Sequence, residues 1–412
     1  MRLLLPLLPL LFGSIASAQT TWTVQAQSTA GDFADIQSAI DAASSGDTIL
    51  IRTGAYDGFE IDGKGLSLVA DQNASVSVTI PANGALIRVE NLGLGNAVTM
   101  RGINIQINTQ LFTAAVGLDL FDNAGEVWIE GMQIKMFHPF TGQEGVVHAA
   151  RVFNSGSVVL IDCDFEAHTA AAGLFQSNSN VYAYGSQICG GIGRPDLFTA
   201  QIHDGGDGAR LFSGQLFSAD SVFEGGKGTD TVPFSCTAAS DGGSGVQLDG
   251  GIFRDRSNSV IGGLGGSGAA CANPDGLDGG GIVMAGGALE SLNEISRSVT
   301  ANSPVFEGNL STQVYSGVPS EVVFTTIGFS LDPGVFFPEF AGPLLLGNPK
   351  IYRFCGLLNM AGTRTKSFTL QELGFDSVTT YFHPFFFDLN TSTWRSGTPA
   401  SVTFMDSGFE TP

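Results

Sequence analysis

The chain contains the segments VTMRGINIQI (residues 98–107), VWIEGMQIKMF (127–137), VVLIDCDFEAH (158–168) and VYAYGSQI (181–188), and their shared pattern decides the fold. Apolar side chains alternate on both sides of a central Gly or Asp, at positions 102, 131, 162 and 185. Because strand side chains alternate between two faces, each segment predicts two strands that meet at a bend. The bends recur after 29, 31 and 23 residues, so we expect stacked coils that share one interior of Val, Ile, Leu and Phe side chains.

The stretch before these coils begins TWTVQAQSTAGDFADIQSAIDAASSGDTILIRTG (residues 21–54). It predicts a strand, a short helix, a second strand over residues 48–52 and a turn at Gly54. The helix would have one apolar face and an acidic N-terminal cap, formed by Ile36, Ala39, Ile40 and Ala43 and by Asp32 as the cap. Residues 21–70 resemble the opening of pectate-lyase-like and pectin-esterase-like proteins. The resemblance implies an all-β protein, a right-handed parallel β-helix with a short N-terminal capping helix, and marks the fold rather than a chemistry.

A longer, glycine-rich repeat follows. Its outgoing half is SQICGGIG, SVFEGGKG and SVIGGLG, and its returning half is DGGDGARL, DGGSGVQL and DGGGIVM, which begin at Asp204, Asp241 and Asp278, 37 residues apart. We expect three glycine-rich loops of about ten to fifteen residues that project in a row from one side of the solenoid. The second and third loops carry Cys236 and Cys271, which makes this the preferred disulfide. Since the chain has five cysteines, at least one has no partner within it.

The N-terminal residues MRLLLPLLPLLFGSIASAQ predict a signal peptide over residues 1–18, because Arg2 precedes an apolar run and Ala16-Ser17-Ala18 offers a cleavage site. The run is shorter than the roughly 20 residues that cross a bilayer, and no later segment is apolar for long enough. We expect a secreted or cell-surface protein without membrane insertion. Asp and Glu outnumber Lys and Arg 39 to 18, for a formal net charge of −21, which argues against nucleic acid or an anionic membrane as partner.

The character of the sequence changes after residue 302. Glycine pairs stop, Phe, Pro and Leu become frequent, and segments such as SEVVFTTIGF (320–329) and TTYFHPFFFDL (379–389) are typical of strands. We expect a β-helix over residues 19–302 and a small C-terminal β-sandwich domain over residues 303–412. This domain is similar, in a general way, to the terminal β-sandwich of many large secreted bacterial proteins, where such modules attach or sort the protein.

Candidate catalytic residues gather around DCDFEAH (residues 162–168). Alternation sends the acidic residues and the histidine to one face, and registering the coils on their bends adds neighbours from the coils on either side. The predicted polar ladder contains Gln133, Lys135, Asp164, Glu166, His168 and Gln187. In related β-helix enzymes exterior carboxylates hold calcium or act as acid and base, while a basic residue abstracts a proton, so the catalytic candidates are Lys135, Asp164, Glu166 and His168.

His138 and Arg151 are close in sequence and are further candidates for this site. The alternative is that the ladder is only the polar outer face that every solenoid needs.

The glycine-rich repeat suggests a second site, for calcium, because glycines let backbone oxygens approach a cation. The candidate metal ligands are Asp204, Asp207, Asp241, Asp275 and Asp278. Arg210 and Gln247 stand where the RTX-type calcium repeat requires Asp, so that motif is absent. The alternative is that the Asp-Gly-Gly runs are plain turns.

Two functions remain open at this stage. The residue sets of pectate-lyase and pectin-esterase chemistry cannot be laid onto this chain without gaps, which favours a non-catalytic protein that binds polysaccharide or another surface partner through its loops and outer sheet. The rival hypothesis is a polysaccharide lyase or hydrolase that acts on acidic, uronate glycans. A purely structural component of the cell envelope is the third possibility.

Overall fold

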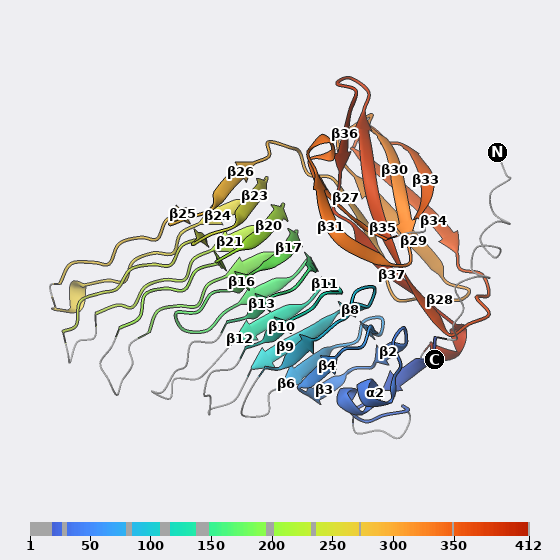
Figure 1. The fold of residues 1–412 in the computed structure, drawn as a ribbon, viewed down its shortest axis with the longest axis horizontal. Coiled ribbons are helices and arrows are strands. Elements are labelled where there is room, and N and C mark those ends of the chain that lie inside the picture. The colour runs from blue at the N-terminus through green and yellow to red at the C-terminus, as the bar shows by residue number, and fades with distance from the viewer. Residues whose placement is uncertain are drawn as a thin grey trace.

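The computed structural model describes residues 19–26, 31–79, 85–107, 116–136, 148–194, 202–231, 236–271, 273–347 and 350–410. The signal peptide predicted over residues 1–18 and the candidate His138 lie outside these ranges. The described chain forms a parallel β-helix of stacked coils, as the sequence predicted, with a smaller all-β domain against one side of it (Figure 1).

Three parallel sheets run along the β-helix, with ten strands in sheet A and eight each in sheets B and C. Sheet A consists of β1 (Thr21–Val24), β2 (Thr48–Ile51), β5 (Ser67–Ala70), β8 (Ala97–Arg101), β11 (Glu126–Glu130), β14 (Ser157–Ile161), β17 (Ser179–Tyr184), β20 (Gly214–Ala219), β23 (Ile252–Arg256) and β26 (Ala288–Ser291). Sheet B consists of β3 (Gly54–Asp57), β6 (Val76–Thr79), β9 (Ile103–Ile107), β12 (Gln133–Met136), β15 (Asp164–Glu166), β18 (Gln187–Cys189), β21 (Val222–Glu224) and β24 (Ser259–Ile261). Sheet C consists of β4 (Phe59–Asp62), β7 (Ile87–Glu90), β10 (Leu118–Phe121), β13 (Ala150–Phe153), β16 (Leu174–Ser177), β19 (Ala209–Leu211), β22 (Val246–Leu248) and β25 (Ile282–Met284).

The interior is filled by columns of identical positions in successive coils. Val98, Val127, Val158 and Val181 are paired in register along sheet A, and none of the four is exposed. Each coil therefore buries its apolar face only by stacking on its neighbours, which is the packing logic of a solenoid.

The predicted bends join sheet A to sheet B. All four bend residues have a positive φ, namely 70° at Gly102, 64° at Gly131, 50° at Asp162 and 56° at Gly185. Glycine adopts this left-handed conformation without steric cost, and Asp tolerates it better than most residues. The repeated bend signal is thus confirmed.

The capping helix α2 (Ile36–Ala42) packs over the first coil against β1, β2 and β4. Ile36, Ala39 and Ile40 are buried, as the pattern predicted. The cap is Asp35, whose carboxylate accepts the backbone N–H of Ser38 at 2.8 Å. The prediction of Asp32 as the cap is wrong, because Asp32 instead accepts the N–H of Thr23, in β1, at 2.8 Å.

The glycine-rich segments do not project as free loops. In three successive coils the chain runs outward from sheet B and returns to sheet C in extended segments that lie side by side (Figure 1). Backbone N–H groups join the outgoing and returning segments, both within a coil and between neighbouring coils. Gly206 donates to Gly191 O and Gly243 to Gly226 O within one coil, and Gly226 donates to Gly206 O and Gly263 to Gly243 O between coils, at 2.7–2.9 Å. These segments form a two-layered slab that projects in a row from one side of the solenoid, as the repeat predicted, but its segments are hydrogen-bonded to one another rather than separate loops.

Glycine is required in this slab because the two layers touch backbone to backbone. A Cβ atom on Gly226 would lie 2.0 Å from the carbonyl oxygen of Gly191, which no side chain can tolerate. Glu224, Lys227 and Asp230 are exposed while the residues between them are buried. This three-residue period matches that of the polyproline II helix, and three of the four buried residues between them are glycines, the residue that collagen places at its crowded positions.

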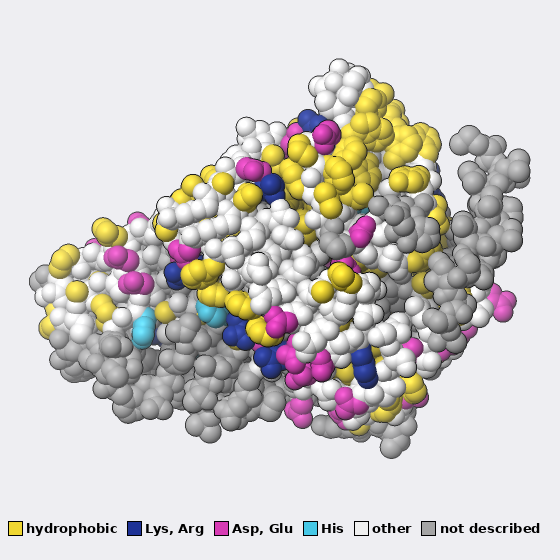
Figure 2. Space-filling model, in the orientation of Figure 1, with side chains coloured by type: hydrophobic (Ala, Val, Ile, Leu, Met, Phe, Trp, Pro, Cys, Tyr) yellow, Lys and Arg dark blue, Asp and Glu magenta, His cyan; other side chains and the backbone are white. Residues whose placement is uncertain are grey.

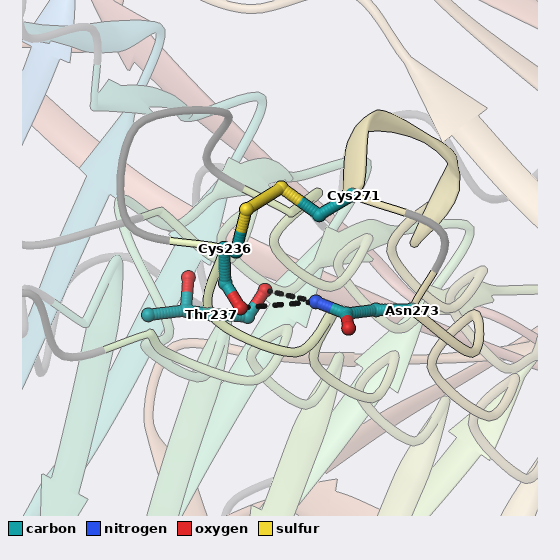
Figure 3. Close-up of a disulfide and its surroundings, with 4 residues drawn as sticks. All are labelled: Cys236, Thr237, Cys271 and Asn273. Carbon is teal, nitrogen blue, oxygen red and sulfur yellow. Dashed lines mark hydrogen bonds between the residues drawn. A yellow bond between two sulfur atoms is a disulfide. The ribbon is translucent and has the colours of Figure 1, made fainter.

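A disulfide closes the outer end of the slab. Cys236 and Cys271 are bonded, with 5.5 Å between their Cα atoms, which confirms the pairing predicted from the repeat. The side-chain amide of Asn273 donates to Cys236 O and Thr237 O at 3.0 and 3.2 Å (Figure 3). The short helix η2 (Ala269–Cys271) leads into this connection. The thiols of Cys163, Cys189 and Cys355 are free.

The C-terminal strands form two sheets that share one hydrophobic core, and therefore a β-sandwich. The smaller sheet is antiparallel and consists of β27 (Ser298–Ala301), β29 (Leu310–Ser316) and β34 (Thr363–Thr369). The larger consists of β28 (Val305–Phe306), β30 (Val322–Gly328), β33 (Lys350–Leu357), β35 (Ser377–Asp388), β36 (Thr393–Ser396) and β37 (Ala400–Met405). A hairpin and two short helices complete it, namely β31 (Leu331–Phe337), β32 (Gly342–Leu346), η3 (Pro338–Phe340) and η4 (Ser407–Phe409).

The sandwich covers the outer face of sheet A over many coils. Strand β35 crosses the strands of the β-helix and bonds them through hydroxyl groups. These pairs are Ser377 with Thr21 and Thr48 (2.8 Å each), Thr379 with Ser67 (3.1 Å), and Tyr381 with Thr99 (2.6 Å).

Farther along the sheet the contact is apolar. One buried cluster joins Trp128, Tyr184 and Phe217 of the β-helix to Leu346 and Tyr381 of the sandwich. Sheet A therefore has little surface left for a ligand, and sheets B and C carry the accessible faces.

The slab predicts that Gly226→Ala is strongly destabilising. The new Cβ must displace the backbone of a neighbouring coil, so the free energy of unfolding should fall by about 3 kcal/mol. Urea titration measures this change. Lys227→Ala is the matched control, because the adjacent side chain is exposed and its loss should cost no more than about 0.5 kcal/mol. Equal effects of the two variants would contradict the packing described here.

A second prediction concerns Glu126, which is 3% exposed beneath the sandwich. Burial raises the pKa of its carboxyl group from 4.5 to about 7, and Asp332 across the interface adds to the rise. Between pH 4.5 and 7 the unfolded chain loses the proton that the folded protein keeps, so stability should decrease as the pH rises, by on the order of 3 kcal/mol in total.

Glu126→Gln should remove this pH dependence, as measured by chemical unfolding between pH 4 and 8. The control is Glu372→Gln at an exposed position, which should keep the wild-type slope. An unchanged slope in Glu126→Gln would show that this carboxyl group is not the cause.

Candidate functional site

The polar ladder predicted on sheet B exists in the predicted register. Gln133 lies beside Asp164, Gln187 lies on its other side, and Lys135 lies beside Glu166. Lys135 Nζ is 3.4 Å from Asp164 Oδ2, and both side chains are partly exposed, at 50% and 32%. The ladder thus brings together three of the four catalytic candidates, although the roles assigned to them stay predictions.

His168 does not join the ladder. Strand β15 ends at Glu166, so the alternation of faces does not extend to the histidine. Its side chain is only 8% exposed, and its Nδ1 lies 2.8 Å from the hydroxyl of Thr169. The prediction that His168 shares the outer face with the two carboxylates is corrected accordingly.

The five aspartates proposed as calcium ligands are not gathered around one point. Within the described ranges, none of them belongs to a group of three ligand side chains that could share an ion. Each accepts a backbone N–H from a nearby segment: Asp204 from Asp241 (3.1 Å), Asp207 from Ser244 (2.9 Å), Asp241 from Leu277 (2.8 Å), Asp275 from Gly268 (2.6 Å) and Asp278 from Gly265 (2.8 Å). These carboxylates therefore hold the slab together, and burial raises the pKa of the most enclosed one, Asp207.

A different acidic group appears where sheet C begins. Glu60, Asp62 and Glu90 offer carboxylate oxygens within 4.8 Å of one another. Burial raises the pKa of Glu90, and the like charges of Glu60 and Asp62 add to the rise against the opposing effect of Arg88. Among the described residues this is the group with the right spacing for a divalent cation. Sequence reasoning missed it, since Asp62 and Glu90 become neighbours only through the register of β4 on β7.

The outer face of sheet C carries a row of charged and aromatic side chains across successive coils. Pairing in register aligns Arg88, Asp119, Arg151, Phe175 and Arg210. Asp119 is 2% exposed and lies beneath two guanidinium groups. Its carboxylate bonds Arg151 at 2.7 and 2.8 Å and lies 3.4 Å from Arg88.

This arrangement fixes the two arginines. The bond to Asp119 raises the pKa of Arg151, so the guanidinium stays charged. A two-bonded arginine has N–H groups left over for a ligand.

Aromatic rings lie next to this row. Phe121 and Phe153 on adjacent coils are stacked, with 5.5 Å between ring centres and 7° between ring planes. Farther along, Phe175 and Phe212 are 5.2 Å apart, and the guanidinium of Arg210 lies 5.1 Å from the Phe212 ring centre. Figure 2 shows hydrophobic, basic and acidic side chains in a band across the face that carries β10, β13 and β16.

A polar trough of about 440 Å³ lies at the turns between sheets C and A, and is lined by the residues that directly follow Phe121 and Phe153 in the chain. Its floor is a ladder of hydrogen-bonded side chains. Asn178 donates to Asn154, and Asn154 donates to Asp122, both at 2.9 Å. Backbone φ values near +50° at all three positions turn these side chains outward in a line. Asn123 and Ser155 form a second, buried ladder beneath them.

We define the sheet C surface as this set: Arg88, Phe121, Arg151, Phe153, Phe175, Arg210 and Phe212, with the trough residues Asp122, Asn154 and Asn178. Arg151, a candidate for the sheet B site, thus lies on a different face. Sequence reasoning missed the surface, although a signal exists: the turns read FDN (121–123), FNS (153–155) and SNS (177–179), which repeats a polar pair at the ends of the three successive strands β10, β13 and β16.

Comparison with known proteins gives no further guide. No model of a protein family matches the chain. No curated protein is similar to it. Within the described ranges, none of the helices has the length and hydropathy needed to cross a membrane.

Proposed function

We propose that this chain is an exported, non-catalytic β-helix protein that binds a polysaccharide along the sheet C surface. The observation that carries the proposal is the stacked Phe121–Phe153 pair beside the trough floored by Asp122 and Asn154. Aromatic rings pack against the C–H faces of sugar rings, and side-chain amides and carboxylates bond their hydroxyl groups. Mostly apolar sites with a few convergent polar groups are typical of ligand recognition.

The geometry suits an extended ligand. The surface repeats from coil to coil along the solenoid axis, at the strand spacing of about 4.8 Å. A polymer lying along this axis meets basic, aromatic or amide side chains on several successive coils, which favours a long chain over a small molecule. Export is supported by the disulfide between Cys236 and Cys271, because disulfides persist in oxidising compartments.

The experiment is a binding assay on the exported chain with neutral polymers (dextran, mannan, cello-oligosaccharides) and acidic ones (polygalacturonate, alginate). Phe121→Ser/Phe153→Ser should raise the Kd for the polymer that binds by at least about tenfold, or about 1.4 kcal/mol. Phe354→Ser is the matched control, because this phenylalanine is 56% exposed on the sandwich and away from the surface. It should bind like the wild type.

Two outcomes would overturn the proposal. The first is full binding by the double variant, or binding to none of the polymers. The second is release of unsaturated products or new reducing ends that stops in Lys135→Gln, which would favour the lyase or hydrolase reading on the sheet B ladder.

A further inference from the structure

The two ends of the β-helix differ. Helix α2 packs over the first coil, whereas no further strand of the described residues pairs with the last coil, formed by β24, β25 and β26, in any of the three sheets. The backbone groups on its outer side therefore have no strand to pair with.

The hydrophobic core of the solenoid extends to this open end. In the coil before it, the inward residues Phe223, Val246 and Phe253 have no exposed surface. Their partners in register on the last coil are Val260, Ile282 and Leu289. Val260 and Ile282 are only partly buried, and Leu289 is 37% exposed.

Large apolar side chains are also exposed around the rim of the last coil. They are Ile261 (49%), Leu264 (64%), Leu277 (72%), Val283 (37%) and Met284 (53%). Soluble monomers seldom expose an apolar area of this kind without a binding function.

The edge strands are short, but they lack the lysine and proline residues that often protect an edge from pairing. Natural edge strands are blunted by lysine, proline, bulges or inward charges. The three terminal strands read SVI, IVM and ALES and contain neither lysine nor proline. Their one charged side chain, Glu290, is paired with Arg254 of the preceding coil at 2.6 Å.

We propose that the last coil is the interface of a dimer in which two copies of this chain meet end to end. The open coil continues the coil-to-coil interface that fills the rest of the solenoid, so its best complement is another coil. Because α2 covers the other end, a copy can offer only the same open end. Contact between identical surfaces is isologous and closes as a two-fold dimer.

A two-fold axis perpendicular to the solenoid reverses the direction of the strands. The edges of the two copies therefore pair antiparallel, and each copy covers the exposed core residues of the other. The dimer places two sheet C surfaces on one continuous solenoid, so the inference goes beyond the proposed function and does not depend on it.

The test is the mass of the exported chain in solution, measured by sedimentation velocity and by light scattering at tens of micromolar. We expect two chains per particle. Leu264→Lys/Met284→Lys should give single chains, with a dimer Kd raised by at least a hundredfold, because two exposed apolar side chains become charged at the interface. Leu94→Lys is the matched control, since Leu94 is 79% exposed away from this end, and it should stay dimeric.

Circular dichroism and thermal unfolding check that each variant is folded, and Met284→Lys alone replaces the double variant if the latter unfolds. Amide hydrogen exchange gives a second readout, with β24–β26 protected in the wild type and unprotected in the variant. Wild-type protein that is monomeric, assembles beyond two chains, or stays dimeric in the folded lysine variant would overturn the proposal.

Discussion

Hydrogen bonding of each coil to the next is the constraint on which the rest of the structure depends. It sets the spacing of the coils, so every inward side chain must fit in a column with its equivalents, as Val98, Val127, Val158 and Val181 do. In the glycine-rich region this spacing leaves no room for a side chain at the contact positions. Two layers of backbone touch directly there, and Gly191, Gly206 and Gly226 bond one another with no room for a Cβ atom. The high glycine content of the chain, 56 residues, is in part the composition of this slab.

The stacking also decides where function can lie. The sandwich covers sheet A through Ser377, Thr379 and Tyr381. Sheets B and C are therefore the faces that a ligand can reach. On sheet B, Lys135 and Asp164 form an exposed ion pair, whereas His168, which was predicted to lie on the same face, is buried. On sheet C guanidinium, aromatic and amide groups lie on successive coils, and a buried carboxylate, Asp119, holds two of the guanidinium groups. A polymer can contact such groups on several coils at once, and for this reason we propose that recognition takes place on sheet C.

The sequence predicted features that depend on local conformation or on repeat phase. The bends at Gly102 and Asp162, the register of Lys135 beside Glu166 and the Cys236–Cys271 pair all follow from counting along the repeat. Prediction from the sequence failed for residues whose role depends on where a strand or helix ends or on partners distant in the sequence. Asp35 rather than Asp32 caps α2, because Asp32 is engaged by β1, and His168 lies beyond the end of its strand. The slab was not predicted, because its hydrogen bonds join residues that are distant in the sequence, within one coil and between neighbouring coils.

The most direct test is hydroxyl-radical footprinting of the protein with and without a polysaccharide selected in the binding assay. We predict that labelling of Phe121, Phe153 and Phe175 decreases on binding, while labelling of the exposed Phe354 on the sandwich stays constant. Protection confined to the sheet B ladder around Lys135, or no protection of the sheet C phenylalanines by a bound polymer, would contradict it.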